Sequence, residues 1–399
     1  MLTAAVLLAV VASAAVLLLP RIADARWWRA TVTPLASIIG SGFLVLGPVL
    51  DASYGIWATA VMFGLCLGAY LFGAAIRDNI ATIDRLGPER NLWQLRLDTA
   101  ASWSLAFAYT ISVAYYLNLL GSFSVSLTPL DDPVHARLVT TAVYAFVLAV
   151  GWFRGFGALE RLEQITVSAK LAIIAGLLTG LVLFLLDRLP ESGLDLSPPD
   201  VTGWSGVTLA FGLIVTVQGF ETTRYLGDEY DARMRIRSMR MAQWIATAIY
   251  VIYVALLSLA FAPGEVALSE TAIIDMMKVV APILPILLVG AALAAQFSAA
   301  VADTGGSGGL IEELTRGRIG VRQSYAVLTA IGLTMTWGLN VFEIIAYASR
   351  AFALYYALQS AIAAHAAWQE PAQRWRAFAF AALAVLGLLV LLFGEAVEA

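Results

Sequence analysis

The sequence predicts an all-α membrane protein that crosses the bilayer many times. Of its 399 residues, 60% are hydrophobic and 13% are charged, whereas about a quarter of the residues in soluble domains are charged. The mean hydropathy is +0.83. Apolar stretches long enough to cross about 30 Å of hydrocarbon recur along the whole chain. These observations exclude a soluble globular domain.

Twelve stretches have the length and apolar character of membrane spans. Most charged residues fall between them, so each stretch is expected to be one helix or one interrupted helix. We number the predicted spans 0 to 11. They cover residues 2–19, 31–50, 54–75, 97–120, 136–153, 159–186, 204–226, 241–261, 282–303, 325–340, 341–365 and 377–393.

Lys and Arg are distributed unequally between alternate loops. Of the 24 Lys and Arg residues, all but five fall in one set of loops. The exceptions are Arg137, Arg188 and Lys278 in the other set, and Lys170 and Arg350 within spans. Because basic loops stay in the cytoplasm, we expect a multi-pass protein of the cell inner membrane with both termini outside.

The first span has features of a cleaved signal peptide. It reads MLTAAVLLAVVASAAVLLLPRIADA, with an apolar core and a small-residue end. It lacks basic residues before the apolar core, and cleavage near Ala25 would leave Arg26 and Arg29 outside. A retained helix is therefore expected.

Charge and residue content exclude several functional classes. The formal net charge is -4, and the arginines form short clusters rather than a continuous basic face, so no nucleic-acid partner is expected. A single cysteine, Cys66, permits neither a disulfide framework nor a thiolate metal site. His135 and His365 lack neighbours with metal-ligating side chains. No catalytic or nucleotide-binding motif appears, so no enzyme, cofactor or metal site is expected.

Two spans are interrupted by helix-breaking residues at half depth. GSG interrupts LASIIGSGFLVLGPVL at residues 40–42, and VTVQGFE interrupts span 6 at residues 215–221. Lipid cannot replace a lost backbone hydrogen bond, so such breaks are tolerated only where the freed groups line a cavity or bind something. The residues at the two breaks are therefore the candidate contacts for a bound molecule.

The two interrupted spans are five spans apart and run in opposite directions, which is typical of two inverted five-helix repeats. A short amphipathic lid helix is expected after Ser269, in the loop between spans 7 and 8. The predicted organisation has an N-terminal helix and linker, a first repeat, an outer loop, a second repeat and a C-terminal helix. Their residues are 1–30, 31–186, 187–203, 204–367 and 368–399.

A family resemblance rests on three segments, IIGSGFLVLGP, GFETTRYLGDEYDARMRIRSMR and LERLEQITVSAKLAIIAGL. They are similar to the first, sixth and fifth core helices of the amino acid, polyamine and organocation (APC) transporters. The resemblance covers most of residues 31–365 and implies a leucine-transporter-type fold. The extra N-terminal helix and the segment AAQFSAAVADTGGSGGL of span 8 are more similar to the sodium/solute symporters of the same superfamily.

The freed amides of the first break lie at the positive end of a half-helix, where they can hold a carboxylate. The alternative is that GSG is a small-residue packing face. In the family resembled, aromatic residues of the third core helix cover the ligand, which implies Tyr109, although most such tyrosines only pack. The candidate substrate contacts are Ile39, Gly40, Ser41, Gly42, Tyr109, Val215, Thr216, Gln218 and Gly219.

Two charged residues are candidates for proton coupling or gating. Glu221 lies at a depth where a carboxylate is costly and usually marks a proton or substrate path; the alternative is a static ion pair with Arg224. In sodium-coupled relatives the ion lies between core helices 1 and 8, near helix 5. The resemblance therefore implies that the ammonium of Lys170 replaces the cation, whereas the alternative is a lysine extended to the inner interface.

Span 8 offers further polar groups. Ser298 and Thr304 are candidates for a cation site because their oxygens suit a hard cation. Asp303 precedes TGGSGG and is expected to cap or hinge the end of the helix. Glu343 and Arg350 are expected to pair with other helices rather than with each other.

The sequence favours a secondary transporter that moves amino acids or related small organic amines by alternating access, coupled to protons or by exchange. A sodium symporter is the alternative, favoured by span 0 and Ser298 and disfavoured by Lys170. A third possibility is a sensor or subunit with a transporter fold and no flux. The expected partners are an amino-acid-like substrate, a proton or sodium ion, and the lipid bilayer.

Overall fold

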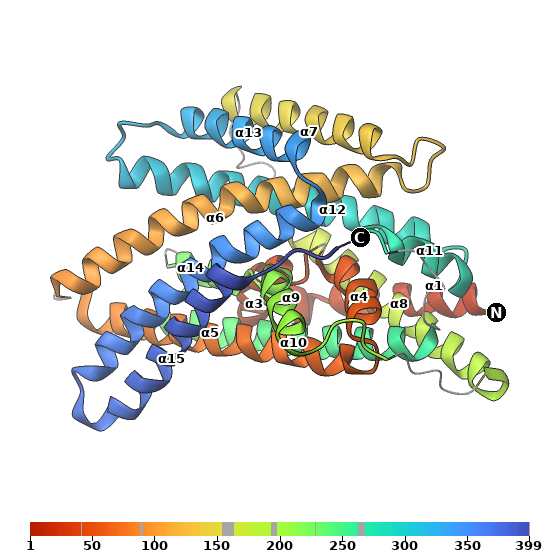
Figure 1. The fold of residues 1–399 in the computed structure, drawn as a ribbon, viewed down its shortest axis with the longest axis horizontal. Coiled ribbons are helices and arrows are strands. Elements are labelled where there is room, and N and C mark those ends of the chain that lie inside the picture. The colour runs from red at the N-terminus through yellow and green to blue at the C-terminus, as the bar shows by residue number, and fades with distance from the viewer. Residues whose placement is uncertain are drawn as a thin grey trace.

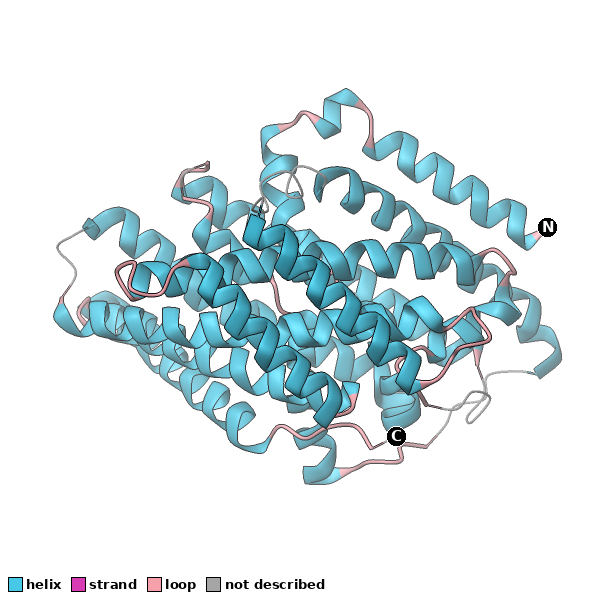
Figure 2. Ribbon diagram, turned by 90° about the horizontal axis from the view of Figure 1, so that it is seen from above, coloured by secondary structure: helices cyan, strands magenta, loops and turns pink. Residues whose placement is uncertain are grey.

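The computed structural model describes residues 1–40, 42–87, 91–153, 163–192, 198–227, 229–261 and 268–398. Within these ranges the chain is a bundle of helices without a strand (Figures 1 and 2). Eight of the described helical stretches are long and apolar enough to cross a membrane. The predicted all-α polytopic fold is confirmed.

Each predicted span overlaps a described helix or a pair of half-helices. The elements before residue 193 are α1 (Leu2–Leu17), α2 (Pro20–Ala23), α3 (Arg26–Ile38), α4 (Gly42–Tyr54), η1 (Gly55–Trp57), α5 (Ala58–Leu86), α6 (Leu92–Val125), α7 (Pro133–Phe153) and α8 (Glu163–Ser192). The later elements are α9 (Gly203–Gly212), η4 (Ile214–Val217), η5 (Phe220–Tyr225), α10 (Ala232–Ala260), α11 (Ala272–Val280), α12 (Leu284–Leu314), α13 (Val321–Gly338), α14 (Val341–Trp368), η6 (Pro371–Gln373) and α15 (Arg374–Phe393).

Several helices extend beyond their predicted spans because helix ends are set by caps rather than by hydropathy. The helix α6 begins at Leu92, before the predicted start at residue 97. Its N-cap is Asn91, whose side chain accepts hydrogen bonds from the backbone N–H groups of Trp93 (2.9 Å) and Gln94 (3.1 Å). These two bonds satisfy donors that an uncapped first turn would leave unpaired.

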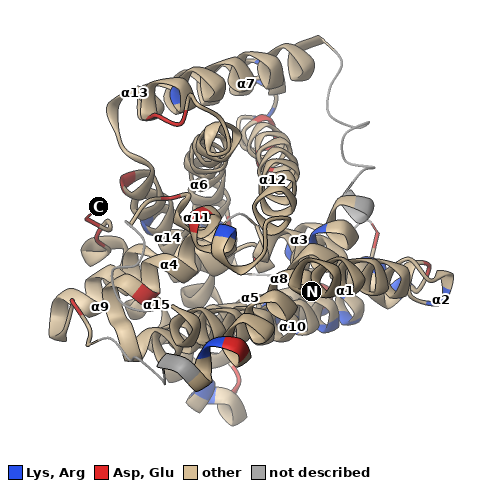
Figure 3. Ribbon diagram, turned by 90° about the vertical axis from the view of Figure 1, so that its right-hand side faces the viewer, with Lys and Arg blue, Asp and Glu red and all other residues tan. Residues whose placement is uncertain are grey.

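Equivalent helices of the two predicted repeats pack against each other. Contacts join α5 to α10, α6 to α12 and α7 to α13. In the view along the bundle, α6 and α12 lie side by side and separate α7 and α13 from the remaining helices (Figure 3). The helix α6 is central. In an apolar stretch of 18 residues within it, 94% is buried inside the bundle, whereas only 22% of such a stretch within residues 371–393 is buried.

The two additional elements of the prediction also have defined places. The helix α1 packs along α8, where Val6 is fully buried and Gly176 leaves room for Val10. The short helix expected after Ser269 is α11, which contacts α4 and α12.

Candidate functional site

The two breaks predicted from the sequence lie against each other. The helix α3 ends at Ile38 and α4 begins at Gly42; Ser41, between them, lies outside the described residues. Gly219 separates η4 from η5 and has a positive φ of 115°, which favours glycine. A Cβ atom on Gly219 would lie 2.5 Å from the carbonyl carbon of Ser37, so only glycine permits this contact with the end of α3.

Side chains from other helices bind the backbone groups that the breaks leave free. The hydroxyl of Tyr250, on α10, lies 2.9 Å from the carbonyl oxygen of Ile38 and 2.7 Å from that of Thr216. On α14, the Ser349 hydroxyl donates to the Gly212 carbonyl oxygen (2.6 Å) and accepts from the Val215 N–H (3.0 Å). Nothing in the sequence pattern marks Tyr250 or Ser349 for this role.

The predicted substrate contacts are mostly buried at this junction. Ile39 and Gly40 line a small cavity of about 20 Å³ together with Lys170. The Gln218 side chain donates to the Tyr116 hydroxyl at 3.0 Å. Val215 and Thr216 are also buried. These positions lie together, as the paired breaks predict, and their role in binding stays a prediction.

Two of the predicted contacts are closely packed. A Cβ atom on Gly42 would lie 2.4 Å from the Tyr115 hydroxyl and 3.1 Å from the Cα atom of Thr216. Gly42 therefore permits close packing of α4 against α6 and η4, as the alternative interpretation of GSG expects. The Tyr109 ring packs edge-on against Phe352, with ring centroids 6.0 Å apart.

Glu221 is completely buried beside the second break. Its Oε2 atom accepts hydrogen bonds from the Gly219 N–H and the Tyr356 hydroxyl, both at 3.0 Å. Its Oε1 atom has no hydrogen-bond partner among the described residues. The alternative of an ion pair with Arg224 is wrong, because the Arg224 side chain extends to other helices.

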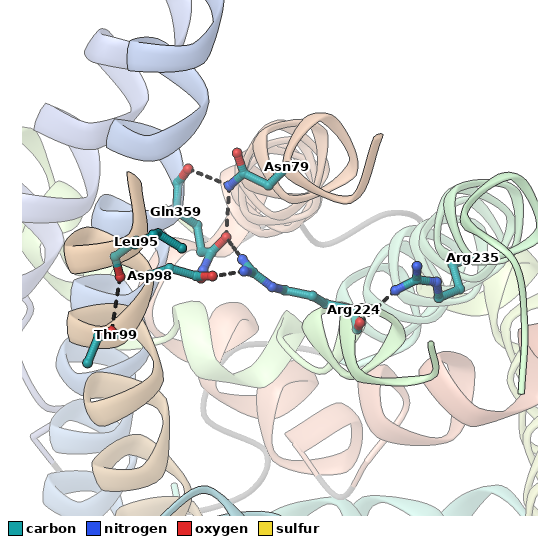
Figure 4. A network of polar contacts seen from close by, with 7 residues as sticks. All are labelled: Asn79, Leu95, Asp98, Thr99, Arg224, Arg235 and Gln359. Atoms are coloured by element: carbon teal, nitrogen blue, oxygen red, sulfur yellow. Dashed lines mark hydrogen bonds and ion pairs between the residues drawn. The ribbon is translucent and has the colours of Figure 1, made fainter. Parts of the chain in front are cut away.

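Arg224 instead connects η5 to the surrounding helices (Figure 4). Its guanidinium donates to Asp98 of α6 and to the side chain of Gln359 on α14. The Asn79 amide of α5 donates to the same Gln359 oxygen at 2.8 Å. Arg235 of α10 donates to the Arg224 carbonyl oxygen at 2.8 Å. We call these five residues the Arg224 network.

A cavity of about 590 Å³ lies between α3, α8, α12 and four residues after the second break, Thr222, Leu226, Glu229 and Tyr230. The exposed side chains of Arg29 and Glu229 lie along it, as do the buried side chains of Lys170 and Asp303. The cavity thus extends from solvent to buried polar groups. We call the end of the bundle that holds Arg29, Glu229 and the Arg224 network the arginine-rich end.

Lys170 points toward the first break. Its side chain is only 7% exposed, and its Nζ atom donates to the carbonyl oxygen of Ala36 at 2.9 Å, close to the end of α3. A lysine extended to the inner interface would be exposed at its tip, so this alternative does not describe the structure. The ammonium joins α8 to α3 and lines a cavity with residues of α12, and its replacement of a cation there stays a prediction.

The expected role of Asp303 as a helix cap is wrong, whereas a hinge at this position stays a prediction. Asp303 lies within α12, which continues to Leu314, and it accepts a hydrogen bond from Ser112 of α6. The glycine-rich segment is part of the helix α12. Its glycines leave space for neighbouring aromatic rings. A Cβ atom on Gly306 would lie 3.1 Å from the Tyr109 ring, and one on Gly308 would lie 2.5 Å from the Tyr325 ring.

The two candidate cation ligands are placed differently. Ser298 lines the 590 Å³ cavity. Thr304 is buried, and its hydroxyl donates to the Ala300 carbonyl oxygen of its own helix at 2.6 Å. Among the described residues, no group of three or more His, Cys, Asp or Glu side chains is arranged to hold a metal ion.

In the part of the chain that the structure describes, Glu343 and Arg350 of α14 do not pair with each other, as expected, but neither pairs with another helix. Glu343 does not pair with another helix: its Oε2 atom accepts from the Asn340 N–H at 2.7 Å and so caps its own helix. Arg350 does contact another segment, because its Nε atom donates to the Gly394 carbonyl oxygen at 2.7 Å.

Comparison with known proteins agrees with this architecture. A family model described as an APC superfamily transporter matches residues 20–394, which include both breaks and the cavity. An uncharacterized protein of Aquifex aeolicus (strain VF5) is 41% identical over 379 residues, covering 94% of this chain and 92% of that protein. The chain therefore belongs to a family of APC superfamily transporters.

Proposed function

We propose that this transporter moves amino acids or related small organic amines by alternating access, coupled to protons or by exchange. The observation that carries the proposal is the 590 Å³ cavity, which connects an exposed rim to Lys170 and Asp303 beside the first break. This volume lies within the range of about 300–1,000 Å³ that is typical of small-molecule sites. Glu221, beside the second break, does not line this cavity; its carboxylate has one oxygen without a partner among the described residues and is the candidate gating group.

Lys170 is the proposed coupling residue. A protonated ammonium donates to the Ala36 carbonyl oxygen and so holds α3 against α8. Loss of the proton leaves a neutral amine that binds this carbonyl less strongly, which shifts the balance between conformations in which α3 is held or released. Protonation is thereby linked to movement of a half-helix that forms one wall of the cavity.

The sodium symporter is less well supported. Lys170 already brings a cationic group to the region between α3, α8 and α12, and the Thr304 hydroxyl is directed to its own helix. Ser298 is the one proposed cation ligand that lines the cavity.

The inverted repeats, residues 31–186 and 204–367, are supported by the pairwise packing of α5 with α10, α6 with α12 and α7 with α13.

Uptake into proteoliposomes tests the proposed function. Purified protein should accumulate at least one amino acid or small amine from a radiolabelled mixture, either with an inward proton gradient in sodium-free buffer or by exchange against a preloaded pool. Protein-free liposomes give the background. The proposal is wrong if no member of the mixture enters above this background under either condition.

The predicted orientation gives a second test. After replacement of Cys66 with serine, a single cysteine at the exposed Leu130 should react with a membrane-impermeant thiol reagent in intact cells, whereas one at the exposed Arg318 should react only after lysis. This result follows if the loops rich in arginine are cytoplasmic and both termini are outside. The reverse labelling pattern would invert the orientation.

A further inference from the structure

Residues 394–398, which follow α15, lie against α9 at the end of the bundle opposite to the arginine-rich end. The Glu395 N–H donates to the Thr208 carbonyl oxygen at 2.9 Å, and the Glu395 carboxylate accepts from the Thr208 hydroxyl at 2.7 Å. Val397 is 6% exposed and belongs to the main hydrophobic core. The segment is therefore docked through backbone, side-chain and apolar contacts together.

The same segment is also attached to α14. The Arg350 guanidinium donates to the Gly394 carbonyl oxygen at 2.7 Å. Its neighbour in sequence, Ser349, bonds the backbone on both sides of the break after α9. The segment thus joins α9 to α14 beside the place where α9 ends.

The contact with α9 is so close that it depends on one glycine. A Cβ atom on Gly212 would lie 1.7 Å from the Glu395 carbonyl oxygen, well inside the distance that any side chain permits. Gly212 lies at the end of α9, where glycine is not needed for helix formation and alanine would be preferred on intrinsic propensity. The glycine therefore leaves room for residues 394–398.

We infer that residues 394–398 form a strap that holds α9 to α14 and must release α9 before a path can open at this end of the bundle. The inference rests on the proposed function, because alternating access requires the end opposite the cavity to open at another stage of the cycle. The seam between α9 and α14 leads to the end of α9 at Gly212, next to the second break, so separating these helices exposes the break. The strap crosses that seam.

The bonds of the strap are suited to reversible release. Glu395 is exposed, so its side-chain hydrogen bond to Thr208 competes with water and is individually weak. Gly394 and Val397 are buried and position the segment when it is docked. An attachment of this kind can hold the closed arrangement without making it permanent.

A reversible cross-link tests whether release is needed. Cysteines at Thr208 and Glu395, in a protein that lacks Cys66, should form a disulfide because the backbone atoms of these residues are already hydrogen-bonded. Oxidation should stop uptake of the amino acid or amine that the wild-type protein accumulates, and a reductant should restore it. The two single-cysteine variants are the controls and should be unaffected by oxidation. Full uptake by the cross-linked protein would overturn the inference.

A second experiment does not depend on flux. In a protein that lacks Cys66 and carries Ser349→Cys, the added Gly212→Ala substitution should displace the strap and increase labelling by a membrane-impermeant thiol reagent. Gly206→Ala, also on α9, is the matched control, since its Cβ would lie 3.5 Å from the Tyr54 ring of α4, which is an ordinary van der Waals contact. Equal labelling of the two alanine variants would show that the strap does not cover the seam.

The two experiments separate the strap from the proposed function. If the wild-type protein carries no amino acid or amine, the proposed function fails, while the labelling of Ser349→Cys still decides whether the strap covers the break. If the wild type transports and the cross-linked protein does so equally well, the strap inference fails and the proposed function stands.

Discussion

Replacement of Lys170 with alanine is expected to reduce proton-driven accumulation to the level of protein-free liposomes. The ammonium is buried and donates to the Ala36 carbonyl oxygen, so alanine removes both the titratable group and the attachment of α3 to α8. Uptake should be measured at equal protein density, with an inward proton gradient in sodium-free buffer. Exchange of substrate between preloaded liposomes and the medium should be measured in parallel.

Lys278→Ala is the matched control. Lys278 also lies on a helix, but its side chain is 52% exposed and pairs with the neighbouring Asp275. A single exposed ion pair contributes little to stability, typically about 0–1 kcal/mol, so this variant should accumulate substrate as the wild type does.

Two results would contradict the role of Lys170. A Lys170→Ala variant with full proton-driven accumulation would show that coupling occurs elsewhere. Wild-type accumulation that requires a sodium gradient at uniform pH would favour the sodium symporter. Loss of accumulation with retained exchange would support coupling most directly, because it separates the driving force from substrate movement.

The features predicted correctly from the sequence are those that depend on local residue types. Apolar length places the spans, because backbone groups in lipid must be satisfied within a helix. The glycines at positions 40, 42 and 219 mark the breaks, because glycine is favoured where a chain leaves helical geometry or approaches another backbone closely. The spacing of the breaks along the chain then predicts that they meet, as Gly219 and Ser37 do.

The features that were missed depend on partners far away in the sequence. A spacing of three residues on a helix allows an ion pair of Arg224 with Glu221, which is the alternative interpretation of Glu221, but η5 turns the guanidinium to Asp98, which is 126 positions away. The segment TGGSGG resembles the end of a helix in water, whereas beside Tyr109 and Tyr325 it is a packing surface. Tyr250 and Ser349 lie in apolar helices, with no spacing that distinguishes them from other buried polar residues.

The second large effect is expected at the Arg224 network. Arg224→Ala should lower the free energy of unfolding by about 3–5 kcal/mol, the range found when one partner of a buried ion pair is removed. The side chains of Arg224 and Asp98 are 8% and 20% exposed, so alanine leaves the Asp98 carboxylate in a largely buried site without its guanidinium. Gln359 loses a donor at the same time, while its bond with Asn79 is left in place.

Thermal unfolding in detergent, followed by tryptophan fluorescence, measures this effect. Arg233→Ala is the control, because Arg233 is exposed on the neighbouring helix α10 and substitutions at such positions usually change stability by less than about 0.5 kcal/mol. The double variant Arg224→Ala/Asp98→Ala should recover part of the loss, since the second substitution removes the largely buried carboxylate that has lost the Arg224 guanidinium. If Arg224→Ala unfolds at the same temperature as the wild type, η5 is not held in place by this network, and the half-helix after the second break must owe its position to its packing against α3, α5 and α10.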